Sequence, residues 1–133
     1  MRLSMKKSLS LLLLVFVLAL AFAVPAMAAS KSYEFYYGGS STSPYNSHVN
    51  GYIVGSADVT GTTVTITLSG DNYGDLQADD GSATFVTASK SFNGSGDSVF
   101  TFTNSNPTSD INTLLYVDAG PHSTTYPLTI HWN

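Results

Sequence analysis

The sequence contains no cysteine, and beyond residue 28 it contains no arginine and no methionine. The missing cysteines exclude disulfide bonds and thiolate metal sites, although many exported domains of this size depend on disulfides. Only two cationic side chains, Lys31 and Lys90, accompany nine carboxylates in residues 29–133. Because phosphate contacts need clustered lysine or arginine, we expect no nucleic-acid partner and no attachment to an anionic membrane surface.

The first 28 residues have the three parts of a secretory signal. Arg2 and nearby lysines precede an apolar run, Leu11 to Val24, and the small residues Ala26 and Ala28 follow two positions apart. A retained anchor is the alternative, but the run is shorter than the ~18–20 residues that cross a bilayer. We therefore expect residues 1–28 to be removed, leaving residues 29–133 as one secreted, extracellular domain without a stable membrane anchor.

Apolar and polar side chains alternate along most of residues 29–133. In Thr62–Leu68 every second side chain is aliphatic, which predicts a half-buried strand, and Ser98–Phe102 and Thr124–Trp132 alternate in the same way. Further strands are predicted at Tyr33–Tyr37, Gly51–Val59, Asp75–Ala78, Ala83–Ala88 and Thr113–Asp118. Short strands separated by frequent turn residues predict an all-β antiparallel sandwich or barrel.

Two local features modify this pattern. β-Propensity drops over Pro44–Asn50, which is the one place where we expect a short helix. Pro127 interrupts the last strand, and because proline cannot donate a hydrogen bond to a ladder, that strand is predicted to lie at an edge or to be locally broken.

Histidine and tyrosine side chains mark one end of the predicted domain. By strand alternation, His122, Thr124 and Tyr126 can project from the same face of the last hairpin. Residues four apart on a strand lie about 13 Å from each other, too far to chelate one metal ion but suited to a flat ligand ligated at one end and stacked at the other. With no cysteine or methionine in residues 29–133, only histidine or tyrosine could hold haem iron.

The chain resembles the NEAT (near-iron transporter) domains of Gram-positive bacteria from Tyr33 to its end. Ser47-x-x-x-x-Tyr52 is similar to the family's lip segment, and "GYIVGSADVTGTTVTITL" is similar to the strand pair that follows it. The segment from His122 to Trp132 matches the family's last hairpin, which carries Tyr-x-x-x-Tyr. The resemblance implies an immunoglobulin-like sandwich of about eight strands, with a short helix in the lip loop.

The resemblance also implies a function: a hemophore-like protein for haem capture or relay in iron acquisition, near the Gram-positive cell surface. It places the haem-binding residues at Ser47, His48, Val49, Tyr52, His122 and Tyr126. The first tyrosine of the family motif is His122 here, so an imidazole replaces the phenolate as iron ligand, or haem binding is lost. An imidazole ligand makes binding weaken at acid pH as His122 becomes protonated.

Other interpretations of these residues remain open. Ser47 could cap the short helix, Val49 and Tyr52 could belong to the core, and His48 could be solvated. The alternative function is a non-haem module that recognises a haemoprotein, another haem-relay protein or a surface partner, and a purely structural or adhesive module is a third reading. No nucleophile elbow or carboxylate in an apolar run is present, so we expect no enzyme activity.

Overall fold

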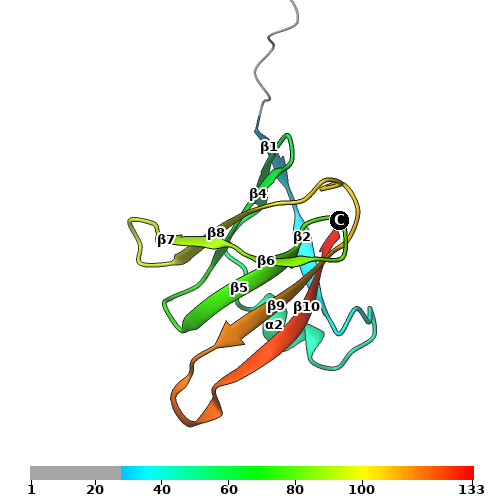
Figure 1. Cartoon of the computed structure of the whole chain (residues 1–133). Coiled ribbons are helices and arrows are strands. Elements are labelled where there is room, and N and C mark those ends of the chain that lie inside the picture. Colours follow the sequence, from blue (N-terminus) through cyan, green and yellow to red (C-terminus); the bar gives the residue numbers. More distant parts are fainter. Residues whose placement is uncertain (1–27) are drawn as a thin grey trace, which may run out of the picture.

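The computed structural model describes residues 28–133, apart from the side chain of His122, and shows a sandwich of two five-stranded antiparallel sheets (Figure 1). The predicted signal peptide, residues 1–28, lies almost wholly outside the described residues. The first sheet has the order β1-β3-β4-β8-β7, and the second has the order β2-β10-β9-β5-β6. The all-β sandwich expected from the sequence is therefore confirmed.

The elements follow one another along the chain with short connections. They are β1 (Ala29–Lys31), β2 (Tyr33–Tyr37), helix α2 (Asn46–Asn50), β3 (Ala57–Thr60), β4 (Thr63–Leu68), β5 (Tyr73–Asp79), β6 (Phe85–Thr87), β7 (Ser89–Phe92), β8 (Ser98–Thr103), β9 (Ile111–Val117), the 3₁₀ turn η1 (Gly120–His122) and β10 (Thr124–Trp132). The chain passes from the first sheet to the second at Ser32, between β1 and β2.

The core lies between the two sheets and comes from the inward positions of the alternating strands. Val64, Ile66 and Leu68 of β4 are fully buried, as their alternation predicts, and Phe100 of β8 lies opposite Ile66 in the ladder. Phe35, Leu115 and Ile130 bring the second sheet into the same cluster. No helix among residues 28–133 is long and apolar enough to cross a membrane.

Two sequence predictions about strands are corrected. Gly51–Val59 is not one strand: only Ala57–Thr60 is regular, because Gly55 has a φ of 68° that no strand residue adopts. The earlier part forms a turn with an isolated bridge between Ile53 and Leu68. The sequence analysis also missed β1 and β7, which lie at the edges of the first sheet.

Pro127 lies where β10 loses one of its two neighbours. Pairing with β2 runs from Trp132 back to Leu128, whereas pairing with β9 continues to Thr124. The carbonyl of Pro127 accepts a hydrogen bond from the amide of Gly38 at 2.8 Å. In a strand, the N–H and C=O of one residue point to the same side. The carbonyl of Pro127 points toward Gly38, just beyond the end of β2, so an N–H at this position would also have pointed there, where no strand needs it as a donor. The predicted break is therefore wrong, because β10 continues through Pro127 in unbroken register with β9 and lies inside the sheet; Pro127 is instead accommodated where β10 has no β2 residue beside it.

The turn between β5 and β6 depends on Gly81. Gly81 has a φ of 98°, and a Cβ there would clash with the side chain of Ser105 and lie 2.9 Å from its amide nitrogen. We expect Gly81→Ala to lower the free energy of unfolding by about 2–4 kcal/mol, because backbone strain and overlap add. Urea unfolding measures this. Gly96→Ala is the matched control, because Gly96 also has a positive φ but has open space around it; an equal loss in the two variants would contradict the clash.

Candidate functional site

The lip helix α2 is held against the outer edge of β2 by two asparagine side chains. Asn50 accepts a hydrogen bond from the amide of Phe35 at 2.6 Å and donates one to the carbonyl of the same residue at 3.3 Å. One turn earlier, Asn46 accepts a hydrogen bond from the amide of Tyr37 at 2.7 Å. The side chains of α2 therefore replace the missing neighbouring strand, and they fix the lip relative to β2.

The predicted lip residues have different environments. Ser47 and His48 are exposed, whereas Val49 is 1% exposed and belongs to the core. Ser47 makes no capping hydrogen bond, because the residue at the N-cap is Tyr45. The hydroxyl of Tyr52 and Nε2 of His48 lie 2.9 Å apart in a hydrogen bond, with the two rings nearly perpendicular.

Tyr126 is the predicted site residue that the last hairpin brings toward the lip. It pairs with Leu115 across the β9–β10 ladder and is half-buried against the core. Its ring contacts that of Tyr37 edge-on, with ring centroids 5.9 Å apart. Burial raises the pKa of Tyr52, and the neighbouring Tyr126 phenol raises it further. The hairpin therefore contacts β2 through Tyr126 and Tyr37, and the Tyr126 phenol acts electrostatically on Tyr52 of the lip.

His122 is not part of the β10 ladder. It is the last residue of η1, and β10 begins at Thr124. Strand alternation therefore does not extend back to His122, and the argument that placed it on the face of Tyr126 fails at this residue. The turn itself is closed by Ser123, whose hydroxyl donates to Asp118 at 2.8 Å and lies 3.0 Å from the carbonyl of Gly120.

A second layer of aromatic rings supports the lip from below. Tyr52 packs edge-on against Tyr73, with centroids 5.8 Å apart, and Tyr73 packs in turn against Phe100 of the other sheet. The Tyr73 hydroxyl donates to the carbonyl of Ser69 at 2.9 Å, and the amide of Ser69 donates to the carbonyl of Tyr52. Burial is the main cause that raises the pKa of Tyr73.

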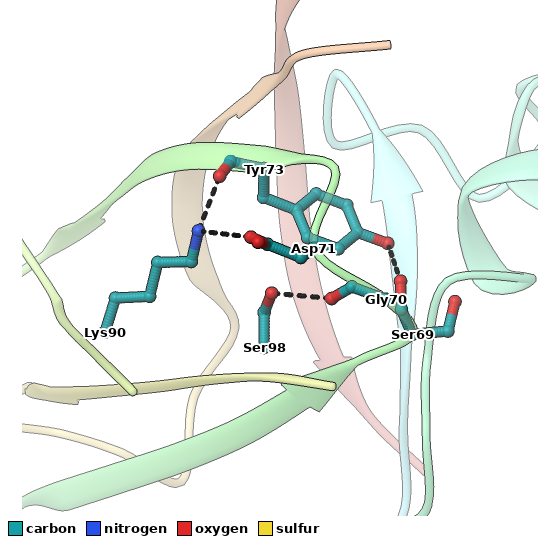
Figure 2. Close-up of polar contacts among 6 residues, drawn as sticks. All are labelled: Ser69, Gly70, Asp71, Tyr73, Lys90 and Ser98. Atoms are coloured by element: carbon teal, nitrogen blue, oxygen red, sulfur yellow. Dashed lines mark hydrogen bonds and ion pairs between the residues drawn. The ribbon is translucent and has the colours of Figure 1, made fainter. Parts of the chain in front are cut away.

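Lys90 of the edge strand β7 contacts Tyr73 and Asp71 at the start of β5, as Figure 2 shows. Its ammonium group donates to the carbonyl of Tyr73 at 2.6 Å and forms an ion pair with Asp71 at 3.3 Å. Ser98 donates to the carbonyl of Gly70 at 2.7 Å (Figure 2). These contacts hold the start of β5, and with it the ring of Tyr73, in place beneath Tyr52.

The arrangement offers aromatic walls and few charges. Tyr37, Tyr52 and Tyr126 are half-buried and pack against the core. The ion pair between Lys90 and Asp71 lies beside Tyr73. Within residues 28–133 no group of three or more His, Asp or Glu side chains could hold a metal ion. Half-buried aromatic side chains of this kind suit contact with a flat, largely apolar ligand.

The sequence analysis missed Asn46, Asn50 and Tyr73 as supports of the site. Asn46 and Asn50 are four apart on a short helix, and this spacing places both on one face, so the pair was visible as a pattern. Its partner was not visible, because the backbone of β2 has no sequence signature as a hydrogen-bonding edge. Tyr73 had no pattern of its own beyond strand propensity.

Comparisons with known proteins find the fold but no relative in sequence. No protein-family model matches the chain, and no curated protein matches it. Two solved structures similar to it are haem complexes of the NEAT5 domain of IsdX2, a B. anthracis hemophore. One is 18% identical, with a TM-score of 0.65 over 81% of this chain and 96% of that chain. The other, a mutant of the same domain, is 16% identical, with a TM-score of 0.66 over 83% and 97%. The chain therefore has the fold of a NEAT domain.

Proposed function

We propose that this protein is a secreted haem-binding module that captures or relays haem during iron acquisition. The observation that carries the proposal is that Tyr52 of the lip and Tyr126 of β10 are both half-buried against the core of a NEAT fold, with burial and Tyr126 raising the pKa of Tyr52. The similar NEAT5 structures are haem complexes, which supports the same ligand here.

The residues present fit haem as cargo. Apolar contact with Tyr37, Tyr52 and Tyr126 supplies most of the affinity, as in other pockets for flat ligands. His122 supplies the axial bond to iron and Tyr126 stacks on the ring. On the lip, Ser47 binds a propionate, His48 approaches the distal face, and Val49 supports the segment from within the core.

The site favours exchange over permanent retention. Ser47 and His48 are exposed, so the lip borders solvent and haem can enter and leave without unfolding the domain. Residues 1–28 act as the signal peptide that exports the chain, and the haem donor or acceptor is then a haemoprotein or another relay protein outside the cell. This role requires binding and release, and no catalytic step.

A haemin titration followed by absorption spectroscopy tests the proposal. We expect a saturable one-to-one Soret band, because one lip and one hairpin form one site. A titration of haemin into buffer alone serves as the reference for unbound and aggregated haemin. Absorbance that rises in proportion to added haemin, without saturation, would be incompatible with a haem site.

A protein-binding module is the second candidate, and Tyr45 favours it. Tyr45 is 60% exposed on the lip loop, where it packs on Tyr37, and exposed tyrosines are frequent in protein-binding surfaces. This function predicts that haemoglobin immobilised with and without haem retains the protein equally, and that no haem is transferred to it.

A further inference from the structure

The outer face of the second sheet carries an open hollow of about 470 Å³ that the proposed haem site does not use. It lies over β5, β9 and β10 and is lined by Gly74, Asp75, Gln77, Leu114, Tyr116 and Thr125. Tyr116 and Thr125 are cross-strand partners, and each is next in sequence to a residue of the Leu115–Tyr126 pair. Because side chains alternate between the faces of a sheet, the hollow and the haem site lie on opposite faces of one hairpin.

A β-bulge in β5 shapes one wall of the hollow. Tyr73 pairs with Val117 and Leu76 pairs with Leu115, so that two residues of β5, Gly74 and Asp75, lie opposite the single residue Tyr116. Tyr73 and Leu76 are both buried, and the extra residue allows both residues between them to face outward. In a regular strand only one residue between two buried ones would face outward. The bulge places two there, and the carboxylate of Asp75 is thereby added to the outer face.

Gly74 lets the ring of Tyr116 lie down on the sheet. A Cβ at Gly74 would come within 2.6 Å of Cδ1 of Tyr116, so no other residue leaves room for the ring in this position. Tyr116 is 39% exposed, so part of its ring is open to solvent. The result is a flat aromatic surface with Asp75, Gln77 and Thr125 around it.

The hollow continues along β9. Leu114 also lines a neighbouring hollow of about 280 Å³, whose lining includes Phe85, Asn112 and Pro127. Tyr116 and Asn112 are four residues apart on one strand, so the two hollows together extend about 13 Å. An elongated ligand of two or three ring units has this length.

The chemistry of the lining limits the ligand. No cationic side chain lines either hollow, and the domain is acidic, so anionic ligands are repelled. The hollows are open, so a ligand keeps much of its surface in water and must be well hydrated. Carboxylate and amide side chains bind hydroxyl groups, and an aromatic face attracts the partly positive C–H groups of an apolar ring face.

We infer that the Tyr116 face binds a neutral oligosaccharide, with a pyranose ring stacked on Tyr116 and its hydroxyl groups bound by Asp75 and Gln77. A pyranose combines one apolar C–H face with equatorial hydroxyl groups, which is the pattern that this surface complements. The inference goes beyond haem binding, and because the two sites lie on opposite faces of the hairpin, each can fail without the other.

The test is titration of the ¹⁵N-labelled protein with cellotetraose, chitotetraose and xylotetraose, followed by ¹H–¹⁵N NMR. We expect saturable shifts at the amides of Gly74, Asp75 and Tyr116 with at least one probe. For that probe, Tyr116→Ala should weaken binding about tenfold or more, whereas Tyr116→Phe should keep it within about threefold because the ring remains. Asp75→Asn should weaken binding without altering the fold.

Phe92→Ala is the matched control, because Phe92 is an exposed aromatic residue on the other sheet; its binding should equal that of the unchanged protein. The inference is overturned if none of the three probes gives saturable shifts up to about 10 mM. The inference is also overturned if Tyr116→Ala binds the probe as well as the unchanged protein does. A dimer in solution that Tyr116→Ala dissociates would overturn it too, because the Tyr116 face would then join two copies of the chain.

Discussion

Replacing His122 by alanine is expected to lower the affinity for haemin by about a hundredfold or more and to change the absorption spectrum of what remains bound. The chain offers no cysteine or methionine beyond residue 28, so loss of the imidazole leaves only tyrosine, or a histidine from the lip, as an iron ligand. A metal–ligand bond contributes more than the contacts that orient it, whose loss already costs about 10–100-fold. Equilibrium titration with haemin, read at the Soret band, measures the change.

The other two histidines provide matched controls for this prediction. His131→Ala removes an imidazole from the same strand, β10, but His131 stacks on Tyr36 and pairs with Asp110 on the outer face, so we expect unchanged haemin affinity. His48→Ala breaks the hydrogen bond to Tyr52 on the lip and should have a smaller effect than His122→Ala. If His131→Ala and His122→Ala weaken binding equally, the assignment of His122 as ligand is wrong.

The strands that the sequence predicted correctly are those with one buried and one exposed face. β4 and β10 begin and end within one residue of their predicted bounds, because Val64, Ile66 and Leu68, or Leu128 and Ile130, repeat at every second position. β7 could not be found in this way. All four of its residues are exposed at the sheet edge, so its pairing with β8 leaves no periodic signal.

The candidate site was predictable as a set of residue types and less so as a geometry. Tyr52 and Tyr126 were named from the sequence, and both are half-buried against the core, where burial and Tyr126 raise the pKa of Tyr52. His122 shows the limit of strand alternation, which presumes an extended chain and therefore gives no direction for a residue in a 3₁₀ turn. The contact that fixes the lip joins a side chain, Asn50, to backbone groups of Phe35, and backbone groups are the same at every position in a sequence.

That contact leads to the second large prediction: Asn50→Leu should lower the free energy of unfolding by about 2–4 kcal/mol. Leucine fills similar space but leaves the amide and the carbonyl of Phe35 without the hydrogen bonds that Asn50 provides, and each unpaired group costs about 1–3 kcal/mol when water cannot replace the partner. Urea unfolding measures the loss. Asn50→Asp tests the two hydrogen bonds separately. Its carboxylate still accepts from the amide of Phe35 but has no N–H to donate to the carbonyl of Phe35. Its free energy of unfolding should therefore lie between that of the unchanged protein and that of Asn50→Leu.

Loss of this contact should also affect the ligand site and the sheet edge, although Asn50 need not touch a ligand. α2 carries Val49 into the core and precedes Tyr52, so its release moves one wall of the proposed haem site, and haemin affinity should fall together with stability. The same release exposes the outer edge of β2, and an uncovered edge strand can pair with another molecule. Asn50→Leu should therefore associate at concentrations where a variant at the exposed asparagine just before β5, Asn72→Leu, stays dispersed in size-exclusion chromatography. Wild-type stability in Asn50→Leu would mean that α2 is held by the packing of Val49 alone.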